Sequence, residues 1–319
     1  MKVSLPARRP ETQFDQPQKR FASRRSAIGR RKERWFYLMI SPWLLGFAAL
    51  QAAPVAAAFV MALFDWPLPQ PPRFVGWDHF AALHQDGLFV KTLLNSLYFT
   101  LGTVPTAIGL GLLLALLLNH KLPGVRLVRA VFLMPAAISG VATTLAWGWV
   151  FNARYGLLNA LLRSVGLPGP SWLLSEILAM PTMMLIHLWT AGVNMIVFLA
   201  AIRAVPAELT EAALIDGADG WQRFRHITWP LISPATFYLL LINLIGTFQV
   251  FTPMYLLTGG GPNNATLTLP LYIYQTAFAW GSLGYASALS AVLFALVLGL
   301  TALLVRSLEP RVYYLGRRA

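Results

Sequence analysis

Long hydrophobic stretches without a charged residue fill most of the chain. Asp, Glu, Lys and Arg are all missing from residues 35–64, 92–120, 130–153, 177–202 and 226–305. A transmembrane helix needs about 20 mostly apolar residues to cross the hydrocarbon core of a bilayer. The last stretch is long enough for two such helices. Its centre, residues 258–264, is a cluster of Gly, Pro and Asn that indicates a loop.

This pattern predicts an all-α polytopic membrane protein with six transmembrane helices. We place them near residues 36–64, 92–119, 129–151, 178–203, 233–257 and 284–305. An alternative for the first helix is a cleaved signal peptide, because Ala56, Ala57 and Ala58 resemble a cleavage site. The uncharged run around them is too long for the apolar region of a signal peptide. We therefore expect residues 35–319 to form one transmembrane domain.

The segment before the first helix differs from the rest of the chain. Residues 1–34 hold 11 Lys or Arg, 3 Asp or Glu and few apolar side chains. Such a composition predicts a disordered tail. Basic residues beside a membrane span are attracted to anionic lipid, whereas an RNA-binding arm would interleave several aromatic residues, of which this tail has only Phe14 and Phe21. We expect the tail to contact lipid headgroups and no nucleic acid.

The basic residues between the predicted helices set the orientation. One side of the membrane receives 21 Lys or Arg and the other side 4. Because loops rich in Lys and Arg stay in the cytoplasm, the sequence predicts that both termini are cytoplasmic. An even number of helices agrees with this orientation.

Composition excludes several kinds of chemistry. Charged residues make up 12% of the chain, against about 25% in a soluble domain, and hydrophobic residues make up 57%. The chain has no Cys, which excludes disulfides, cysteine-ligated metals and thiol nucleophiles. Apart from Arg129 and Arg203 at the ends of two of them, the predicted helices contain no charged residue, which argues against proton coupling. None of the five lysines follows a Gly, so a phosphate-binding loop of the Gly-Lys-Ser/Thr type is excluded.

The loop after the fourth predicted helix, residues 205–230, is unusual because it holds 4 of the 12 acidic residues. Pro206 suits the first position of a helix, and Gly217 suits a left-handed helix stop. Asp219 can cap a second short helix, which Pro230 would end before the fifth transmembrane helix. The sequence predicts a helix–turn–helix that docks on a partner.

This loop resembles the EAA loop of binding-protein-dependent ABC importer permeases. Glu211, Ala212 and Ala213 are followed after three residues by Gly217, after nine more by Ile227, and after one more by Trp229 and Pro230. The family pattern is the same except for Leu in place of Trp229. Further segments are similar to the sugar-importing branch of the family, which includes maltose-type and glycerol-3-phosphate-type permeases. They are residues 74–80, 155–159, 216–218, 258–262 and 284–288.

The resemblance implies a type I ABC importer permease fold in a bacterial or archaeal cytoplasmic membrane. It implies that the EAA loop couples the chain to a cytoplasmic ATPase dimer, which would bind the ATP and Mg while this chain holds no cofactor. A second, similar permease and an external binding protein would complete the importer. The implied coupling residues are Glu211, Ala212, Ala213, Gly217, Ile227 and Pro230. A packing role for Ile227 and Pro230 is an equal alternative.

The transport path of such a protein is expected near the membrane midplane. Aromatic faces and neutral amides suit the rings and hydroxyls of a sugar or polyol. The candidates are Trp189, Asn194, Asn243, Thr247, Phe248 and Gln249. Hydrogen bonding between helices is an equal alternative for the two asparagines. Apart from Arg129 and Arg203 at helix ends, no Arg lies in the predicted helices to hold a phosphate, which favours a neutral sugar.

Two other functions remain open at this point. An autonomous secondary carrier or channel for a neutral solute would explain the six helices but not the ordered acidic loop. A membrane enzyme would need clustered acids or histidines, and the outer loops offer only Asp78, His79 and His84 as a conceivable metal cluster. We therefore expect a transport subunit without enzymatic activity and without a metal site.

Overall fold

The computed structural model describes residues 27–67, 69–120 and 123–313. The chain divides into two compact units, residues 1–57 and residues 58–319. In the first unit, helix α1 (Ala27–Phe47) continues through a π-helical turn, η1 (Ala48–Ala52), into α2 (Ala53–Met61). The helix starts at Ala27, so residues 27–34, which we predicted to be disordered, are helical. The Arg, Lys and Glu residues there are strong helix formers, and the rest of the predicted tail lies outside the described residues.

The second unit begins with a small module of two strands and a short helix, which the longest helix follows. Strands β1 (Phe64–Asp65) and β2 (Arg73–Phe74) pair antiparallel, with Phe64 opposite Phe74. Helix α3 (Asp78–Ala82) leads to α4 (Gly87–Leu117). The helices that follow are α5 (Val125–Ala137), α6 (Gly140–Val150), α7 (Leu157–Ser164), α8 (Ala179–Leu188), η2 (Trp189–Ala191) and α9 (Gly192–Arg203).

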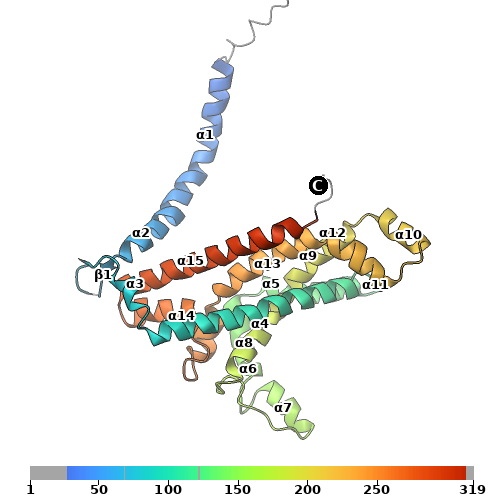
Figure 1. The fold of residues 1–319 in the computed structure, drawn as a ribbon. Coiled ribbons are helices and arrows are strands. Elements are labelled where there is room, and N and C mark those ends of the chain that lie inside the picture. Colours follow the sequence, from blue (N-terminus) through green and yellow to red (C-terminus); the bar gives the residue numbers. More distant parts are fainter. Residues whose placement is uncertain (1–26, 68, 121–122, 314–319) are drawn as a thin grey trace, which may run out of the picture. The chain divides into compact units, whose positions relative to one another are not determined.

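The remaining helices carry the loop of interest and the last two predicted spans. They are α10 (Ala207–Ile215), α11 (Gly220–Arg223), η3 (Phe224–Thr228), α12 (Trp229–Leu231), α13 (Ser233–Phe248), η4 (Met254–Thr258), α14 (Leu269–Tyr274), η5 (Gln275–Ala279), α15 (Leu283–Leu308) and η6 (Glu309–Arg311). In Figure 1, α4, α13 and α15 run side by side. The pair α10 and α11 lies at one end of these helices, and α3 lies at the other.

Four of the predicted spans are straight helical segments and two are bent. Among the described residues, four helical segments could cross a membrane by length and composition, and the count is up to six if each of two bent pairs is one span. The predicted helix at 129–151 is broken between α5 and α6 by a bend of 106°. Pro135 lies just before this break, and its ring disturbs the helical hydrogen bonding there. The predicted helix at 233–257 ends at Phe248, and only the π-helical turn η4 follows before the loop.

Helix α4 is the centre of the second unit. It packs against α8, α9, α13 and α14 and contributes to two buried hydrophobic clusters. The first cluster includes Phe99, Met183 and Leu269, and the second includes Ile108 and Phe198. Both clusters form where neighbouring helices pack on α4, so this helix holds the bundle together.

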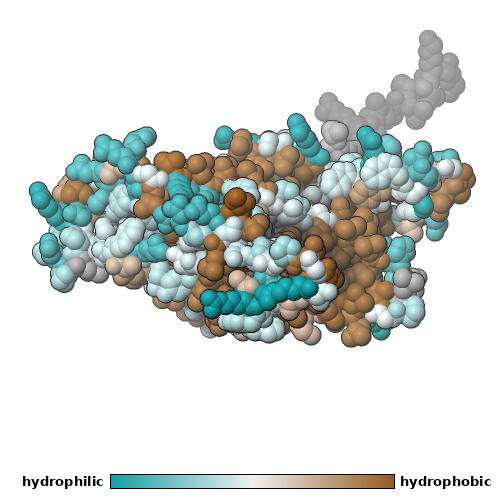
Figure 2. Space-filling model, turned by 90° about the horizontal axis from the view of Figure 1, so that it is seen from below, coloured by the Kyte–Doolittle hydropathy of each residue, from teal (hydrophilic) through white to brown (hydrophobic). Residues whose placement is uncertain are grey.

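Large hydrophobic side chains also cover much of the outside of the chain. Broad hydrophobic areas occupy the face shown in Figure 2. Exposed examples are Leu94, Leu101, Leu127, Leu298 and Leu303. Soluble monomers rarely expose contiguous apolar patches of this extent. The surface therefore fits a chain that is surrounded by lipid and by other subunits.

Candidate functional site

The acidic loop between α9 and α13 is the first candidate site, and its first limb is α10. Pro206 is the N-cap of this helix, one position before the place that we predicted, and has extended torsion angles of φ −57° and ψ 131°. Glu208 lies in the first helical turn, where the helix dipole favours a negative charge. Glu211 follows on the same helix and is exposed to solvent.

The turn after α10 is built around Gly217, as the sequence predicted. Gly217 has a φ of +79°, a left-handed conformation that is unfavourable for other residues. The N–H of Ala218 donates to the carbonyl of Ala213 at 2.9 Å, and the N–H of Gly217 donates to that of Leu214 at 3.1 Å. These two bonds form a Schellman motif, which fixes the end of α10.

The second limb starts at Asp219, which is also where the sequence placed it. The carboxylate of Asp219 accepts from the N–H of Gln222 at 2.7 Å, and the amide oxygen of Gln222 accepts from the N–H of Asp219 at 2.9 Å. This reciprocal pair is a capping box. Each limb of the loop is thus fixed by its own hydrogen bonds, which makes the tip between them rigid.

Pro230 does not end the second limb, contrary to our prediction. The helix widens into the π-helical turn η3, where the N–H of Trp229 donates to the carbonyl of Phe224, and it continues through Pro230 to Leu231. A proline ring collides with the carbonyl four residues earlier in a regular α-helix, and a wider turn relieves that collision. The bend of 63° comes at the junction with α13.

The predicted coupling residues divide into an exposed and a half-buried set. Exposed ones are Glu211, Ala212 and Gly217, and half-buried ones are Ala213, Ile227 and Pro230.

Large apolar side chains that we had not singled out lie beside them. Ile215 at the end of α10 is 88% exposed and Trp221 at the start of α11 is 66% exposed. Trp229, which stands where the family pattern has Leu, packs its ring against Phe224, with ring centroids 6.1 Å apart. Ile215 could have been found in the sequence, because it is an apolar residue directly before Asp216 and Gly217, where the helix was predicted to end. An apolar residue at a solvated tip points to a contact with another protein.

Three of the predicted transport-path residues are brought together between helices. Asn243 on α13 donates to the amide oxygen of Asn194 on α9 at 3.1 Å, and Asn194 donates back at 3.4 Å. Asn194 also donates to the carbonyl of Ala107 on α4. The hydroxyl of Thr247 bonds to the carbonyl of Asn243 within α13. This network fastens α9 to α13 and to α4.

The other transport-path residues do not join this network. Phe248 is buried in the interior. Gln249 lines a cavity of about 400 Å³ between α13 and α15 together with Ser290 and Phe294. Trp189 lines a different cavity, so Trp189 and Gln249 do not share one site.

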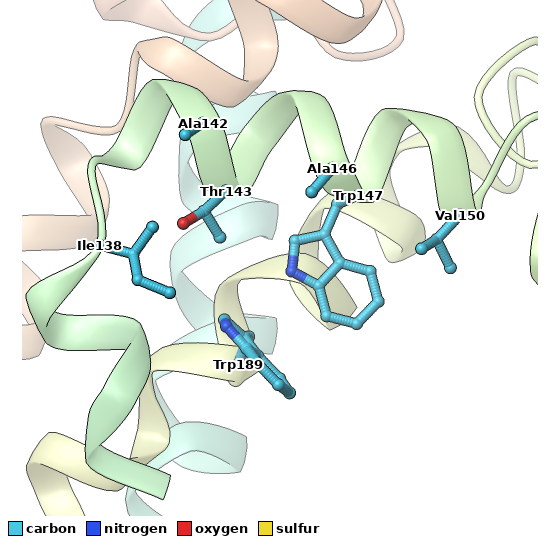
Figure 3. A pocket seen from close by; sticks show the side chains of 7 residues that line it. All are labelled: Ile138, Ala142, Thr143, Ala146, Trp147, Val150 and Trp189. Atoms are coloured by element: carbon cyan, nitrogen blue, oxygen red, sulfur yellow. The ribbon is translucent and has the colours of Figure 1, made fainter. Parts of the chain in front are cut away.

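The cavity at Trp189 is an apolar recess at the break between α5 and α6. It measures about 500 Å³ and is lined by Ile138, Ala142, Thr143, Ala146, Trp147, Val150 and Trp189. In Figure 3 the indole rings of Trp147 and Trp189 lie next to each other beside the open space, and the hydroxyl of Thr143 lies near its mouth. The two rings meet at 78°, with centroids 5.4 Å apart. The edge of one ring thus meets the face of the other, which gives the recess an aromatic wall.

A hydrogen-bonded clasp at the N-terminal end of α4 was missed in the sequence. The carboxylate of Asp86 caps α4 through the N–H groups of Leu88 and Phe89 and accepts from the hydroxyls of Tyr272 at 2.5 Å and Tyr285 at 2.6 Å. Burial raises the pKa of the Asp86 carboxyl, but the hydrogen bonds from the two tyrosines and two N–H groups lower it more, below the ordinary value of 3.8. Asp86 therefore joins α4, α14 and α15 as an anion.

The same end of α4 also holds the loop at 258–264. Lys91 donates to the carbonyl of Asn263 at 2.5 Å, and Asn95 donates to the carbonyls of Asn264 at 2.8 Å and Leu267 at 2.9 Å. Asn263 and Asn264 have positive φ angles of 44° and 58°, which asparagine tolerates better than most residues. This loop is thus held against the N-terminal end of α4.

His79 of the module that precedes α4 takes part in packing, whereas His84 is exposed. The ring Nε2 of His79 lies 3.2 Å from the carbonyl of Phe64. Within the described residues, no group of three His, Asp or Glu side chains could hold a metal ion.

Comparison with known proteins identifies the family. The sequence profile of the binding-protein-dependent transport system inner membrane component family matches residues 79–314. The sulfoquinovosyl glycerol transport system permease protein of Agrobacterium fabrum (strain C58) is 34% identical over 86% of this chain and 90% of that protein. The arabinooligosaccharides transport system permease protein of Bacillus subtilis (strain 168) is 35% identical over 82% of this chain and 84% of that protein.

A solved structure shares the fold. A bacterial ABC transporter involved in the import of the acidic polysaccharide alginate superposes with a TM-score of 0.77 and 26% identity, covering 88% of this chain and 98% of that one. This likeness confirms the predicted type I importer permease fold, and the family match confirms the resemblance stated for the EAA loop. The chain belongs to the binding-protein-dependent transport system inner membrane component family and is a permease subunit of an ABC importer.

Proposed function

We propose that this permease takes up a sugar or a related polyol and that a separate subunit hydrolyses the ATP. Both relatives described above are permeases for sugar derivatives, and the family name states dependence on a binding protein. In this proposal an external binding protein delivers the substrate, and a second, similar permease forms the other half of the path. The chain itself needs no cofactor, because the ATPase holds ATP and Mg.

The coupling loop carries the proposal. Its tip combines the carboxylate of Glu211 with the exposed apolar residues Ile215 and Trp221, on two limbs that the Schellman motif and the capping box hold rigid. A charged group beside apolar side chains suits a cleft on another protein, where a charge-assisted hydrogen bond to Glu211 would be partly shielded from water. A rigid tip can transmit a push from an ATPase dimer into α9 and α13, whereas a flexible tip would absorb it.

The orientation follows from the same assignment. The loop must face the compartment that contains ATP, so we place it in the cytoplasm of a bacterial or archaeal cell, together with both termini. The Lys and Arg split of 21 to 4 points the same way.

The recess at Trp189 is our candidate for a part of the substrate path. It lies at a helix break, where the free backbone groups of α5 and α6 are available to a polar ligand. The indole faces of Trp147 and Trp189 can pack on a sugar ring, and Thr143 adds a hydroxyl. Because the named relatives include carriers of acidic sugars, the substrate screen must contain neutral and acidic oligosaccharides.

Purification after mild cross-linking in native membranes tests the proposal. We expect mass spectrometry to find an ATPase and a second permease with an EAA loop beside this chain. The variant Glu211→Lys should insert into the membrane but lose uptake by at least tenfold, because a reversed charge repels its basic partner. Glu208→Lys is the matched control, since it makes the same change one helical turn earlier on α10, and it should retain most of the uptake.

Recovery of this chain alone, under conditions that keep other transporter complexes intact, would favour an autonomous carrier. Unchanged uptake by Glu211→Lys would remove the coupling role of this residue.

A further inference from the structure

The cytoplasmic ends of three helices meet at a cluster of arginines that the proposed function does not use. Arg126 and Arg129 lie in the first turns of α5, and Arg203 lies in the last turn of α9. Helices α5 and α9 pack against each other. Arg129 also donates through Nη2 to the carbonyl of Leu118, just beyond the end of α4. The guanidinium groups therefore gather where α4, α5 and α9 come together.

Among the residues that the structure describes, no negative charge offsets the positive charge of this cluster. The two charges that act on Arg129 are those of Arg203 and Arg126, and both are positive. The Nε of Arg129 is enclosed without a hydrogen-bond acceptor. Arg126 and Arg203 are exposed, so both can reach a ligand from outside. Three arginines held together in this way repel one another unless an anion lies between them.

The backbone next to the cluster also offers donors. The N-cap of α5 is Gly124, which has no side chain to cap the helix. The first N–H groups of a helix lack intrahelical partners and favour an anion. The helix start and the arginines thus present donors and positive charge to the same place.

Exposed apolar side chains continue along α5 toward the membrane interior, on a face that lies about a quarter turn from Arg126 and away from Arg129. Leu127, Val131 and Met134 are all exposed and are spaced four and three residues apart along α5, so they share one face of the helix. A free phosphate ion would use only the arginines. A molecule with an anionic head and long hydrocarbon chains would use both the arginines and these apolar side chains.

We propose that Arg126, Arg129 and Arg203 bind the phosphate headgroup of an anionic phospholipid, whose acyl chains lie along the exposed face of α5. Arginine pairs well with phosphate because its planar fork donates two hydrogen bonds to one group. The bound lipid holds the end of α9, directly before the coupling loop. Lipid binding itself does not depend on the transport assignment, whereas its effect on uptake does.

Native mass spectrometry of the purified complex tests the proposal. The complex is exchanged from nanodiscs that contain phosphatidylglycerol and phosphatidylcholine in equal amounts, and the lipids that remain bound are counted. We expect retention of phosphatidylglycerol. Each arginine near anionic lipid contributes about 1 kcal/mol, so affinity should fall roughly fivefold for Arg203→Gln and about a hundredfold for the triple glutamine variant.

The matched control is Arg306→Gln. Arg306 also lies in the last turn of a helix, α15, and is also exposed, but it has no place in the cluster. It should leave lipid retention unchanged. A triple lysine variant keeps the charge and should retain most of the binding, which separates loss of charge from loss of fold.

Three results would overturn the proposal. One is equal retention of both lipids by the wild-type complex. Another is an equal loss of phosphatidylglycerol retention in the Arg203→Gln and Arg306→Gln variants. The third is displacement of the bound lipid by inorganic phosphate, because that result would assign the cluster to a soluble anion. If the lipid is retained as expected but uptake does not depend on it, the site stands and only its link to the coupling loop fails.

Discussion

At the scale of single residues, the amides of Asn194 and Asn243 show how a polar group can be placed between transmembrane helices. Each amide donates to the other across the contact between α9 and α13, and each also donates to a backbone carbonyl. An unpaired amide in this environment would cost about 1–3 kcal/mol. The pair therefore stabilises the contact even if one of the amides also meets the substrate.

Replacing either asparagine by alanine should lower the stability of the bundle. We expect Asn194→Ala and Asn243→Ala each to reduce the free energy of unfolding by about 1 kcal/mol, because the remaining amide loses its partner. The double variant should lose less than the two single effects together. Thermal unfolding of the complex in nanodiscs measures this, with Asn119→Ala, an exposed amide beyond α4, as the control.

The two single variants and the double variant also distinguish a packing role from a transport role for these two asparagines. Reduced stability with unchanged substrate affinity would assign both amides to the helix contact. Unchanged stability with weaker substrate binding would assign them to the transport path and contradict the packing role.

At the scale of helices, α4 owes its central place to small residues on its buried face. A Cβ on Gly111 would come within 2.6 Å of the Cβ of Asn194 on α9, whereas a Cβ on Gly109 would meet nothing within 4 Å. The close approach of α4 and α9 thus depends on Gly111 and not on Gly109. Small residues at helix contacts are typical of membrane proteins, because they let backbones come near each other.

This difference predicts opposite effects for the same substitution on one helix. Gly111→Ala should destabilise the complex by about 1–3 kcal/mol, because the added methyl forces α4 and α9 apart. Gly109→Ala should leave stability unchanged or raise it by up to about 1 kcal/mol, because alanine is the better helix former. Thermal unfolding of the two variants side by side checks this. An equal loss of stability in both variants would show that α4 and α9 are not in close contact.

Helices and their breaks differ in how well the sequence predicts them. Every uncharged stretch became one or more helices, because the bilayer requires apolar length. The break between α5 and α6 is less visible, since Pro135 permits a bend but the packing of neighbouring helices sets its angle. The coupling loop was largely predictable because Gly217 and Asp219 act through bonds to residues a few positions away. The clasp at Asp86 was not, because its tyrosines lie 186 and 199 residues further on.

The clasp predicts a pH dependence of stability. Because the pKa of Asp86 in the fold lies below its ordinary value of 3.8, the ionised carboxylate stabilises the fold above that pH. The contribution is lost as the pH falls through the lower pKa of the folded state. Asp86→Asn should therefore lower the melting temperature near neutral pH, and the difference from the wild type should shrink below about pH 4.

Melting curves of the complex at neutral and acidic pH measure this difference. Asp78→Asn on α3 is the control, because Asp78 is exposed and its replacement leaves the clasp in place. A difference between Asp86→Asn and the wild type that is the same at every pH would mean that the charge of Asp86 plays no part.

At the scale of the whole molecule, transport requires that the coupling loop and the outer loops lie on opposite sides of the membrane. The segment from Ala179 to Arg203 is long and apolar enough to cross it once. Ser171 precedes this segment and Ala207 follows it, and both are exposed. These two positions therefore report on the two faces of the membrane.

The lack of cysteine makes the orientation directly measurable, because single cysteines can be introduced without removing others. We expect a membrane-impermeant maleimide to label Ser171→Cys in intact cells. Ala207→Cys should be labelled only after the membrane is made permeable, because the basic loops hold α10 in the cytoplasm. If only Ala207→Cys were labelled in intact cells, the orientation would be opposite to the one proposed here. The loop would then lie on the side of the membrane that lacks ATP. Labelling of both in intact cells would mean that the segment between them does not cross the membrane.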